Sequence, residues 1–164
     1  IGILGIVNFD TIFDIVDNFN KHGQRWKFFT NGGLEDSSLG IDFCKQLNLD
    51  PVEYLVVPTT PQELVLTISH FKGIITARLH SCIVAYSLDI PFIVISWNGK
   101  VDFFARYAGC PERVITADTL SSKYIVDSLS IALDQGFDQT IKGENRRVAS
   151  EYAKKYVDIL NGSK

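Results

Sequence analysis

Short, nearly continuous apolar runs alternate along the chain with longer stretches in which apolar residues recur every three or four positions. The apolar runs predict β-strands at 3–7, 26–29, 53–57, 73–77, 92–96 and 113–115. Most of these runs are rich in β-branched or aromatic residues and lack a strict apolar–polar alternation. This pattern is typical of strands that are buried on both faces of a parallel sheet.

The amphipathic stretches between the strands predict helices at 11–22, 36–47, 80–88, 101–107, 121–133 and 144–160, and one more that starts after Thr60. That last helix has the clearest start signal in the chain. Thr60 is a candidate N-cap, Pro61 takes the first helical position, and Glu63 stands where a capping box needs it. Asp10 is a candidate cap for the first helix, and Glu35 and Asp36 are expected to support the start of the second.

Six strand–helix units in series predict an α/β fold, namely a Rossmann-like, doubly wound and mainly parallel sheet of about six strands flanked by helices. Neither a linker nor a repeat interrupts the 164 residues, so we expect one domain over residues 1–164. A hydrophobic share of 46% excludes intrinsic disorder. The chain contains no methionine and opens on Ile1, so we expect it to be a piece of a longer protein.

Charge and cysteine content narrow the range of partners. The net charge of −3 provides no basic footprint for nucleic acid, and the basic residues of 144–160 read as a solvated helix face. Cys44, Cys82 and Cys110 are far apart and odd in number, which favours buried thiols and a cytoplasmic location. No apolar stretch approaches the roughly 20 residues of a membrane-spanning helix.

Common nucleotide and hydrolase motifs are absent from the sequence. Gly2 and Gly5 lie at the start of the first predicted strand and within it, and not in the turn after it, so the dinucleotide-binding context is missing. Neither a phosphate-binding loop with its lysine nor a nucleophile elbow occurs. In this fold class ligands bind at the carboxyl ends of the strands, so the residues that follow each strand are the ones to weigh.

The strongest candidate cluster is Arg78, Leu79 and His80, which follows the fourth strand and opens the next helix. A helix N-terminus favours anions, and two basic side chains there oppose the helix dipole unless an anion is bound. The guanidinium of Arg78 suits a carboxylate or a phosphate, and His80 suits proton transfer. The alternative is structural: Arg78 bonds to strand-end carbonyls and His80 caps the helix.

Two further loops contribute candidates. Trp97 and Lys100 follow the fifth strand, and Asn31 and Gly32 follow the second. Lys100 would help to bind an anion or be an ordinary exposed lysine, and Trp97 would stack on a sugar or pack under its loop. Asn31 and Gly32 would shape a ligand loop or only a turn.

Residues 71–109 resemble the polysaccharide pyruvyl transferase family. The resemblance rests on an apolar strand, then Arg78-Leu79-His80, then Pro91 leading a strand, then Trp97, and then Lys100-Val101. Two positions depart from the family pattern. Trp97 stands where the family usually has tyrosine, which removes a phenol hydroxyl. Asp89 stands where the family usually has glycine, and we expect this to change only a turn.

The resemblance implies a transferase of polysaccharide synthesis that moves a pyruvyl group from phosphoenolpyruvate to a sugar and forms a ketal. Arg78 and Lys100 would hold the donor's anionic groups, His80 would move protons, and neither a metal nor another cofactor would be needed. The chain would be the C-terminal half of a glycosyltransferase-B-like protein, inactive without its N-terminal half.

Two rival functions stay open at this point, as does assembly into a homo-oligomer. One rival is a nucleotide-sugar glycosyltransferase or epimerase of the same architecture. The other is a non-catalytic carbohydrate-binding domain, since a fold alone does not imply catalysis.

Overall fold

A computed structural model describes residues 2–4 and 8–162 of the chain. Its six strands are β1 (Gly2–Leu4), β2 (Lys27–Phe29), β3 (Leu55–Val56), β4 (Ile74–Thr76), β5 (Phe92–Ile95) and β6 (Val114–Ile115). Each lies within or overlaps an expected apolar run, which confirms all six predicted strands. Residues 5–7 of the first predicted strand lie outside the described residues.

The strands form one sheet in the order β3-β2-β1-β4-β5-β6, and every neighbouring pair is parallel. The chain runs outward from β1 to β3, returns to the other side of β1, and continues from β4 to β6. This order reverses beside β1, where a doubly wound sheet opens its ligand crevice. The predicted Rossmann-like fold is therefore confirmed.

The helices are α1 (Phe9–Lys21), α2 (Leu34–Gln46), α3 (Pro51–Tyr54), α4 (Pro61–Ser69), α5 (Leu79–Ser87), α6 (Gly99–Tyr107), α7 (Ser122–Gln135) and α8 (Gln139–Gly162), with short 3-10 turns at Pro111–Arg113 and Ala117–Thr119. Every predicted helix is present. The sequence reasoning missed α3, a single turn started by the Asp50 side chain, which accepts a hydrogen bond from the Val52 amide.

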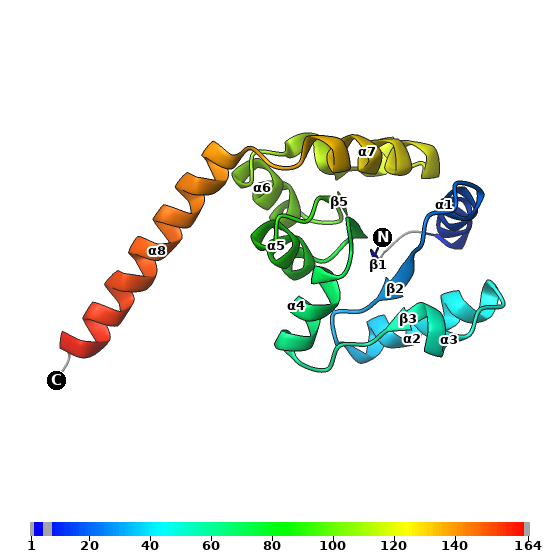
Figure 1. Cartoon of the computed structure of the whole chain (residues 1–164), viewed down its shortest axis with the longest axis horizontal. Helices are drawn as coiled ribbons and strands as arrows, with labels where there is room; N and C mark the ends of the chain where they lie inside the picture. The colour runs from blue at the N-terminus through cyan, green and yellow to red at the C-terminus, as the bar shows by residue number, and fades with distance from the viewer. Residues whose placement is uncertain (1, 5–7, 163–164) are drawn as a thin grey trace.

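Two apolar clusters sandwich the sheet (Figure 1). Helices α1, α2 and α7 cover one face, where residues such as Phe19 and Leu129 pack on Ile75 and Ile93. Helices α4, α5 and α6 cover the other face around Phe92. Strands β4 and β5 are buried along their whole length, as the unbroken apolar runs predicted.

Two helix starts differ in detail from the sequence expectation. Asn8, not Asp10, caps α1, because its side-chain oxygen accepts the Thr11 amide. At α4 the side chain of Thr60 accepts the amide of Glu63, as predicted, but the Glu63 carboxylate reaches one residue further back, to Thr59. The Glu63 carboxylate thus accepts the amide of Thr59, the residue before the N-cap, where the predicted capping box would use the amide of the N-cap residue itself.

The three cysteines are free and buried, as predicted. Burial raises the pKa of the Cys82 thiol well above its ordinary value and that of Cys110 to about 11. Burial therefore favours the protonated thiol over the thiolate at both positions. Among the described helices, none has the length and apolar character needed to cross a membrane.

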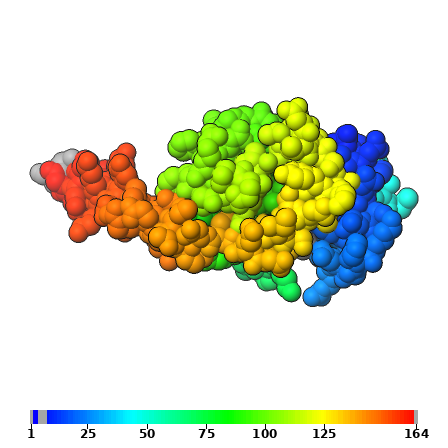
Figure 2. Space-filling view, turned by 90° about the horizontal axis from the view of Figure 1, so that it is seen from above, coloured from blue at the N-terminus to red at the C-terminus, as the bar shows by residue number. Residues whose placement is uncertain are grey.

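Helix α8 leaves the sheet body and extends far beyond it (Figures 1 and 2). Its outer side chains from Glu151 onward are exposed, and Arg147 pairs with Glu144 and Glu151 along the helix. The basic residues of 144–160, namely Arg146, Arg147, Lys154 and Lys155, are therefore solvated, as expected.

The start of α8 is attached to the body through Asp89, where the sequence predicted only a changed turn. Asp89 has a φ of +60°, a conformation for which glycine is the usual choice. Its carboxylate lies 2.5 Å from the buried Lys142 ammonium and accepts a bond from Gln139. Asn145 adds bonds to the Tyr86 hydroxyl and the Tyr107 carbonyl. The expectation was wrong: this side chain joins the turn before β5 to α8.

Candidate functional site

The carboxyl edge of the sheet gathers the loops that the sequence singled out. Because all strands are parallel and β1 lies between β2 and β4, the loops after β2 and β4 flank the end of β1. The loop after β3 lies on the outer side of β2, and the loop after β5 lies beyond β4.

The loop after β2 is held in a fixed shape. The buried hydroxyl of Thr30 accepts the amide of Gly32. Gly32 has a φ of +87°, and a Cβ there would lie 2.9 Å from the Pro58 carbonyl oxygen. The side chain of Asn31 is fixed from the other side, because its oxygen accepts a 2.8 Å bond from the hydroxyl of Ser81 in α5. Asn31 and Gly32 are therefore tied to the helix that starts after β4.

The start of α5 exposes His80 and leaves backbone amides available. Arg78 is the N-cap residue, and its own amide is bonded to the Thr76 hydroxyl. Within the described part of the chain, no side chain caps this helix start. His80, the second residue of the helix, is exposed. The partial positive charge of a helix start and a histidine thus stand at the same point of the edge.

A hollow of about 370 Å³ opens between α4, α5 and the loops after β2 and β3. We call it the α4–α5 hollow. Its polar lining comes from the start of α4, from the loop after β2 and from His80, and its apolar lining comes from the facing sides of the two helices. The lining residues are Asn31, Gly32, Pro58, Thr59, Thr60, Pro61, Leu64, Val65, His80, Ile83 and Val84. The structure therefore brings three predicted residues, Asn31, Gly32 and His80, to one cavity.

Arg78 turns toward a carboxylate, a partner that the sequence reasoning did not foresee. Its Nε lies 3.2 Å from Asp36 Oδ2, and its Nη2 donates to Asp36 Oδ1. Asp36 is only 7% exposed, and the two residues are 42 positions apart. Asp36 does stand in the first turn of α2, as expected, but its carboxylate forms a two-pronged ion pair that joins the starts of α2 and α5.

The other predicted residues lie outside the α4–α5 hollow. Trp97 is 58% exposed, and its indole N–H donates a 2.8 Å bond to the carbonyl of Ala77 at the end of β4. Lys100 is exposed in the first turn of α6, which Asn98 caps. Leu79 packs against the core on the α4–α6 face. The structure thus gives Leu79 a packing contact and leaves Trp97 and Lys100 on the β5 side of the edge.

A metal site needs several His, Cys, Asp or Glu side chains that converge on one point. Over residues 2–4 and 8–162, no group of three or more His, Cys, Asp or Glu side chains is arranged to hold a metal ion. The positive charge that the edge offers comes from Arg78, Lys100 and the helix starts.

The fold and the edge together define a doubly wound α/β protein with a candidate ligand site beside the first turn of α5. A family model for polysaccharide pyruvyl transferase matches residues 9–99 of the chain. That segment includes more than half of the chain and every predicted site residue except Lys100. The chain belongs to the polysaccharide pyruvyl transferase family, a family of transferases. No curated protein matches the chain significantly.

Proposed function

We propose that the chain takes part in the transfer of a pyruvyl group from phosphoenolpyruvate to a pair of hydroxyls on a saccharide, which gives a ketal. The observation that carries this proposal is the meeting of His80, Asn31 and the uncapped start of α5 at one hollow inside the family segment. The acceptor-side groups would come from an N-terminal half of the same protein.

Phosphoenolpyruvate carries a carboxylate and a phosphate, so its site needs positive charge that is already in place. The amides at the start of α5 supply such a charge without a counterion of their own. The amide group of Asn31, held by Ser81, would orient one of the anionic groups.

The reaction requires two proton movements, which fit one histidine. Two sugar hydroxyls form C–O bonds to the central carbon of the donor, and the bond from that carbon to the phosphate oxygen breaks. One hydroxyl proton ends on the methylene carbon, which becomes a methyl group, and the other leaves with the phosphate. His80, exposed at the hollow, would accept a hydroxyl proton and deliver it.

Arg78 would act together with Asp36. Because Asp36 already neutralises much of its charge, Arg78 is poorly suited to serve alone as an anion clamp. The pair would fix the start of α5 and keep one face of the guanidinium at the edge, since the Arg78 side chain is 29% exposed. Trp97, held by the Ala77 carbonyl, would offer its exposed indole to the saccharide, and Lys100 would face the donor from the β5 side.

The experiment is a transfer assay with the intact protein and its His80→Ala variant. The variant should lose transfer rate by about 100- to 10,000-fold, the range expected for removal of a general acid–base group. His22→Ala is the matched control, since His22 is an exposed histidine at the end of α1, far from the carboxyl edge. A His80→Ala protein that transfers pyruvyl at the normal rate would refute the assignment.

The donor is tested separately from the catalytic residue. Phosphoenolpyruvate should bind the intact protein saturably, and uridine or guanosine diphosphate sugars should not compete with it. Tight binding of a diphosphate sugar in place of phosphoenolpyruvate would favour the nucleotide-sugar enzyme. Saccharide binding without turnover of any donor would favour the carbohydrate-binding domain.

A further inference from the structure

The α4–α5 hollow is divided into a polar part and an apolar part. Its polar residues, which include His80, stand at the starts of α4 and α5 and in the loops before them. Its apolar walls stand about one helical turn further along the same two helices, roughly 5 Å along the axis, and are made by Leu64, Val65, Ile83 and Val84. A ligand that enters from the carboxyl edge therefore meets polar groups first and apolar groups beyond them.

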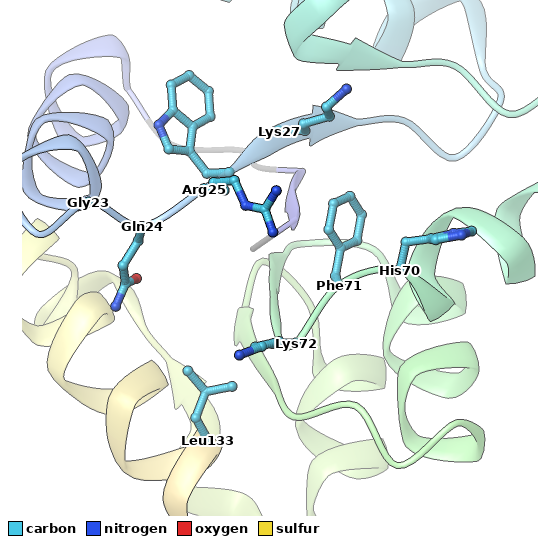
Figure 3. A pocket seen from close by; sticks show the side chains of 9 residues that line it. Gly23, Gln24, Arg25, Lys27, His70, Phe71, Lys72 and Leu133 are labelled. Carbon is cyan, nitrogen blue, oxygen red and sulfur yellow. The ribbon is translucent and has the colours of Figure 1, made fainter.

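This division is not a general property of cavities in the chain. A larger cavity, of about 710 Å³, lies at the amino-terminal edge of the sheet (Figure 3). Arg25, Lys72, Phe71 and Leu133 share its lining, so charged and apolar side chains are mixed in it. The separation of the two kinds is thus a specific feature of the α4–α5 hollow.

Packing explains only half of the apolar walls. Leu64 and Val84 are partly buried and pack against the core on the α4–α6 face. Val65 and Ile83 are 41% and 39% exposed, and among the described residues neither of them packs against one of the two core clusters. Both side chains are β-branched and stiff. They therefore offer a fixed apolar surface that a ligand in the hollow would cover.

His80 stands between the two parts of the hollow. Residues 80, 83 and 84 are spaced three and four apart, so they share one face of α5. In the reaction proposed above, the start of α5 holds the donor's anionic groups and His80 delivers a proton to its methylene carbon. A substituent on that carbon would extend along the same face of α5, toward Ile83.

Phosphoenolpyruvate does not fill this space. The volume of about 370 Å³ lies within the range of sites for drug-sized ligands, which are much larger than this donor. Its one apolar group is the methylene group, which lies beside His80 when it receives the proton. The walls at Val65 and Ile83 are then left without a contact from the donor.

We propose that the α4–α5 hollow also accepts enol phosphates of 2-oxo acids whose carbon chain is longer than that of pyruvate, and that Val65 and Ile83 set the limit of chain length. This inference rests on the proposed function. The step balances as before: two saccharide oxygens bond to the central carbon, and the bond from that carbon to the phosphate oxygen breaks. One hydroxyl proton goes to the alkylidene carbon, and the other leaves with the phosphate.

The test compares two donors with the intact protein, namely phosphoenolpyruvate and the enol phosphate of 2-oxobutyrate. The longer donor should be transferred with a kcat/KM within about tenfold of that for phosphoenolpyruvate, because its extra methyl group finds room. A kcat/KM more than about tenfold lower, with normal transfer from phosphoenolpyruvate, would overturn this inference and leave the proposed function standing. Transfer from neither donor would refute the proposed function and this inference with it.

Variants that fill the apolar part locate the longer chain. Ile83→Phe and Val65→Phe should each lower the ratio of kcat/KM for the longer donor to that for phosphoenolpyruvate by about tenfold or more, the cost of a methylene that no longer fits. Leu66→Phe is the matched control, since Leu66 is 60% exposed on α4 and lies outside the hollow lining, and it should leave the ratio unchanged. An unchanged ratio in both wall variants, or an equal fall in the control, would refute the assignment.

The opposite substitution separates a role in the site from a role in the fold. Ile83→Ala enlarges the hollow and should raise the relative use of a still longer donor, the enol phosphate of 2-oxopentanoate. The change should appear in KM, because an alkyl contact is made equally before and during the reaction. A fall in kcat for all donors alike, with no change in their ratio, would show that Ile83 serves only the fold, against the proposal.

Discussion

At the scale of single residues, the candidate site depends on the backbone conformation of Gly32 and on the paired carboxylate of Asp36. Gly32 holds the loop after β2 in a left-handed conformation against the Pro58 carbonyl, and Asp36 holds Arg78. Neither residue lies in the segment that suggested the family resemblance. Each is nevertheless needed to bring that segment together with the loop after β2.

The first prediction concerns Gly32. Gly32→Ala should lower the free energy of unfolding by about 1–3 kcal/mol, because alanine at a positive φ is strained and its methyl group would press on the Pro58 oxygen. Gly99→Ala is the matched control, since Gly99 lacks a positive φ and has open space around it, and it should change stability by less than about 0.5 kcal/mol. Urea denaturation of both variants measures the difference in their free energies of unfolding. Equal losses of stability in the two variants would contradict the claim that the positive φ of Gly32 requires glycine.

The second prediction concerns the ion pair between Asp36 and Arg78. Asp36→Asn should destabilise the chain by about 1–3 kcal/mol, because it removes a buried carboxylate from a charged, two-pronged contact. Asp42→Asn removes an exposed carboxylate of the same helix, 3.7 Å from Lys45, and should cost less than about 0.5 kcal/mol.

A double-mutant cycle with Arg78→Ala tests whether that loss comes from the pair. In the Arg78→Ala background, Asp36→Asn should cost much less than it does alone. If the two substitutions are simply additive, the ion pair does not stabilise the fold and Asp36 does not position Arg78.

At the scale of elements, the attachment of α8 differs most from what a sequence reading suggests. The helix spans Gln139–Gly162, yet its contacts with the body occur near its start, through Asp89, Tyr86 and Tyr107. The Lys142 ammonium also lies over the Tyr86 and Phe137 rings, at 5.3 and 5.9 Å from their centroids. One turn before a strand therefore decides where a long helix leaves the molecule.

The third prediction is a pH dependence at this attachment. The hydrogen bond with Lys142 lowers the pKa of the Asp89 carboxyl below its ordinary value. A lowered folded-state pKa adds stability above the unfolded-state value of about 4, and this stability is lost as the pH falls through the folded-state pKa. Because the Asp89 side chain is half-exposed, the gain should stay below about 1 kcal/mol.

Asp89→Asn measures this gain and keeps a residue that tolerates a positive φ. At pH 7 the variant should be slightly less stable than the parent chain, and the difference should shrink as the pH is lowered below about 4. In a Lys142→Met background the same substitution should have almost no effect at any pH. A difference that persists at low pH would show that the charge of Asp89 is not what holds α8.

At the scale of the whole molecule, the two edges of one sheet carry different chemistry. The carboxyl edge gathers helix starts, His80 and the α4–α5 hollow, and the amino edge gathers helix ends and a cavity of about 710 Å³ between the segments 23–27 and 70–72. Both follow from the parallel sheet: its strands all run one way, so the helices that connect them run back and start at the carboxyl edge. The family match covers much of both edges, so it does not by itself decide which cavity binds which ligand.

Within the described residues, the sequence by itself determined the six strands, seven of the eight α-helices and the loops that lie at the carboxyl edge. It could do so because these features depend on local patterns: apolar runs, helical spacing and a start signal such as Thr60-Pro61. It also identified His80, because a histidine in the first turn of a helix is visible without a partner. The sequence did not predict the single-turn α3, because four residues are too few to show a helical period.

Only the tertiary structure decided which of these residues meet. Arg78 and Asp36 are 42 positions apart, Asn31 and Ser81 are 50 apart, and one cavity is lined by segments around residues 25 and 72. Asp89 is likewise 50 positions from its partner Gln139 in α8. Such contacts depend on which strands are neighbours and on where the helices pack. The order of elements along the chain predicts the class of fold, but it does not predict which side chains meet. Local pattern therefore predicted the parts of the site, and long-range packing set their partners.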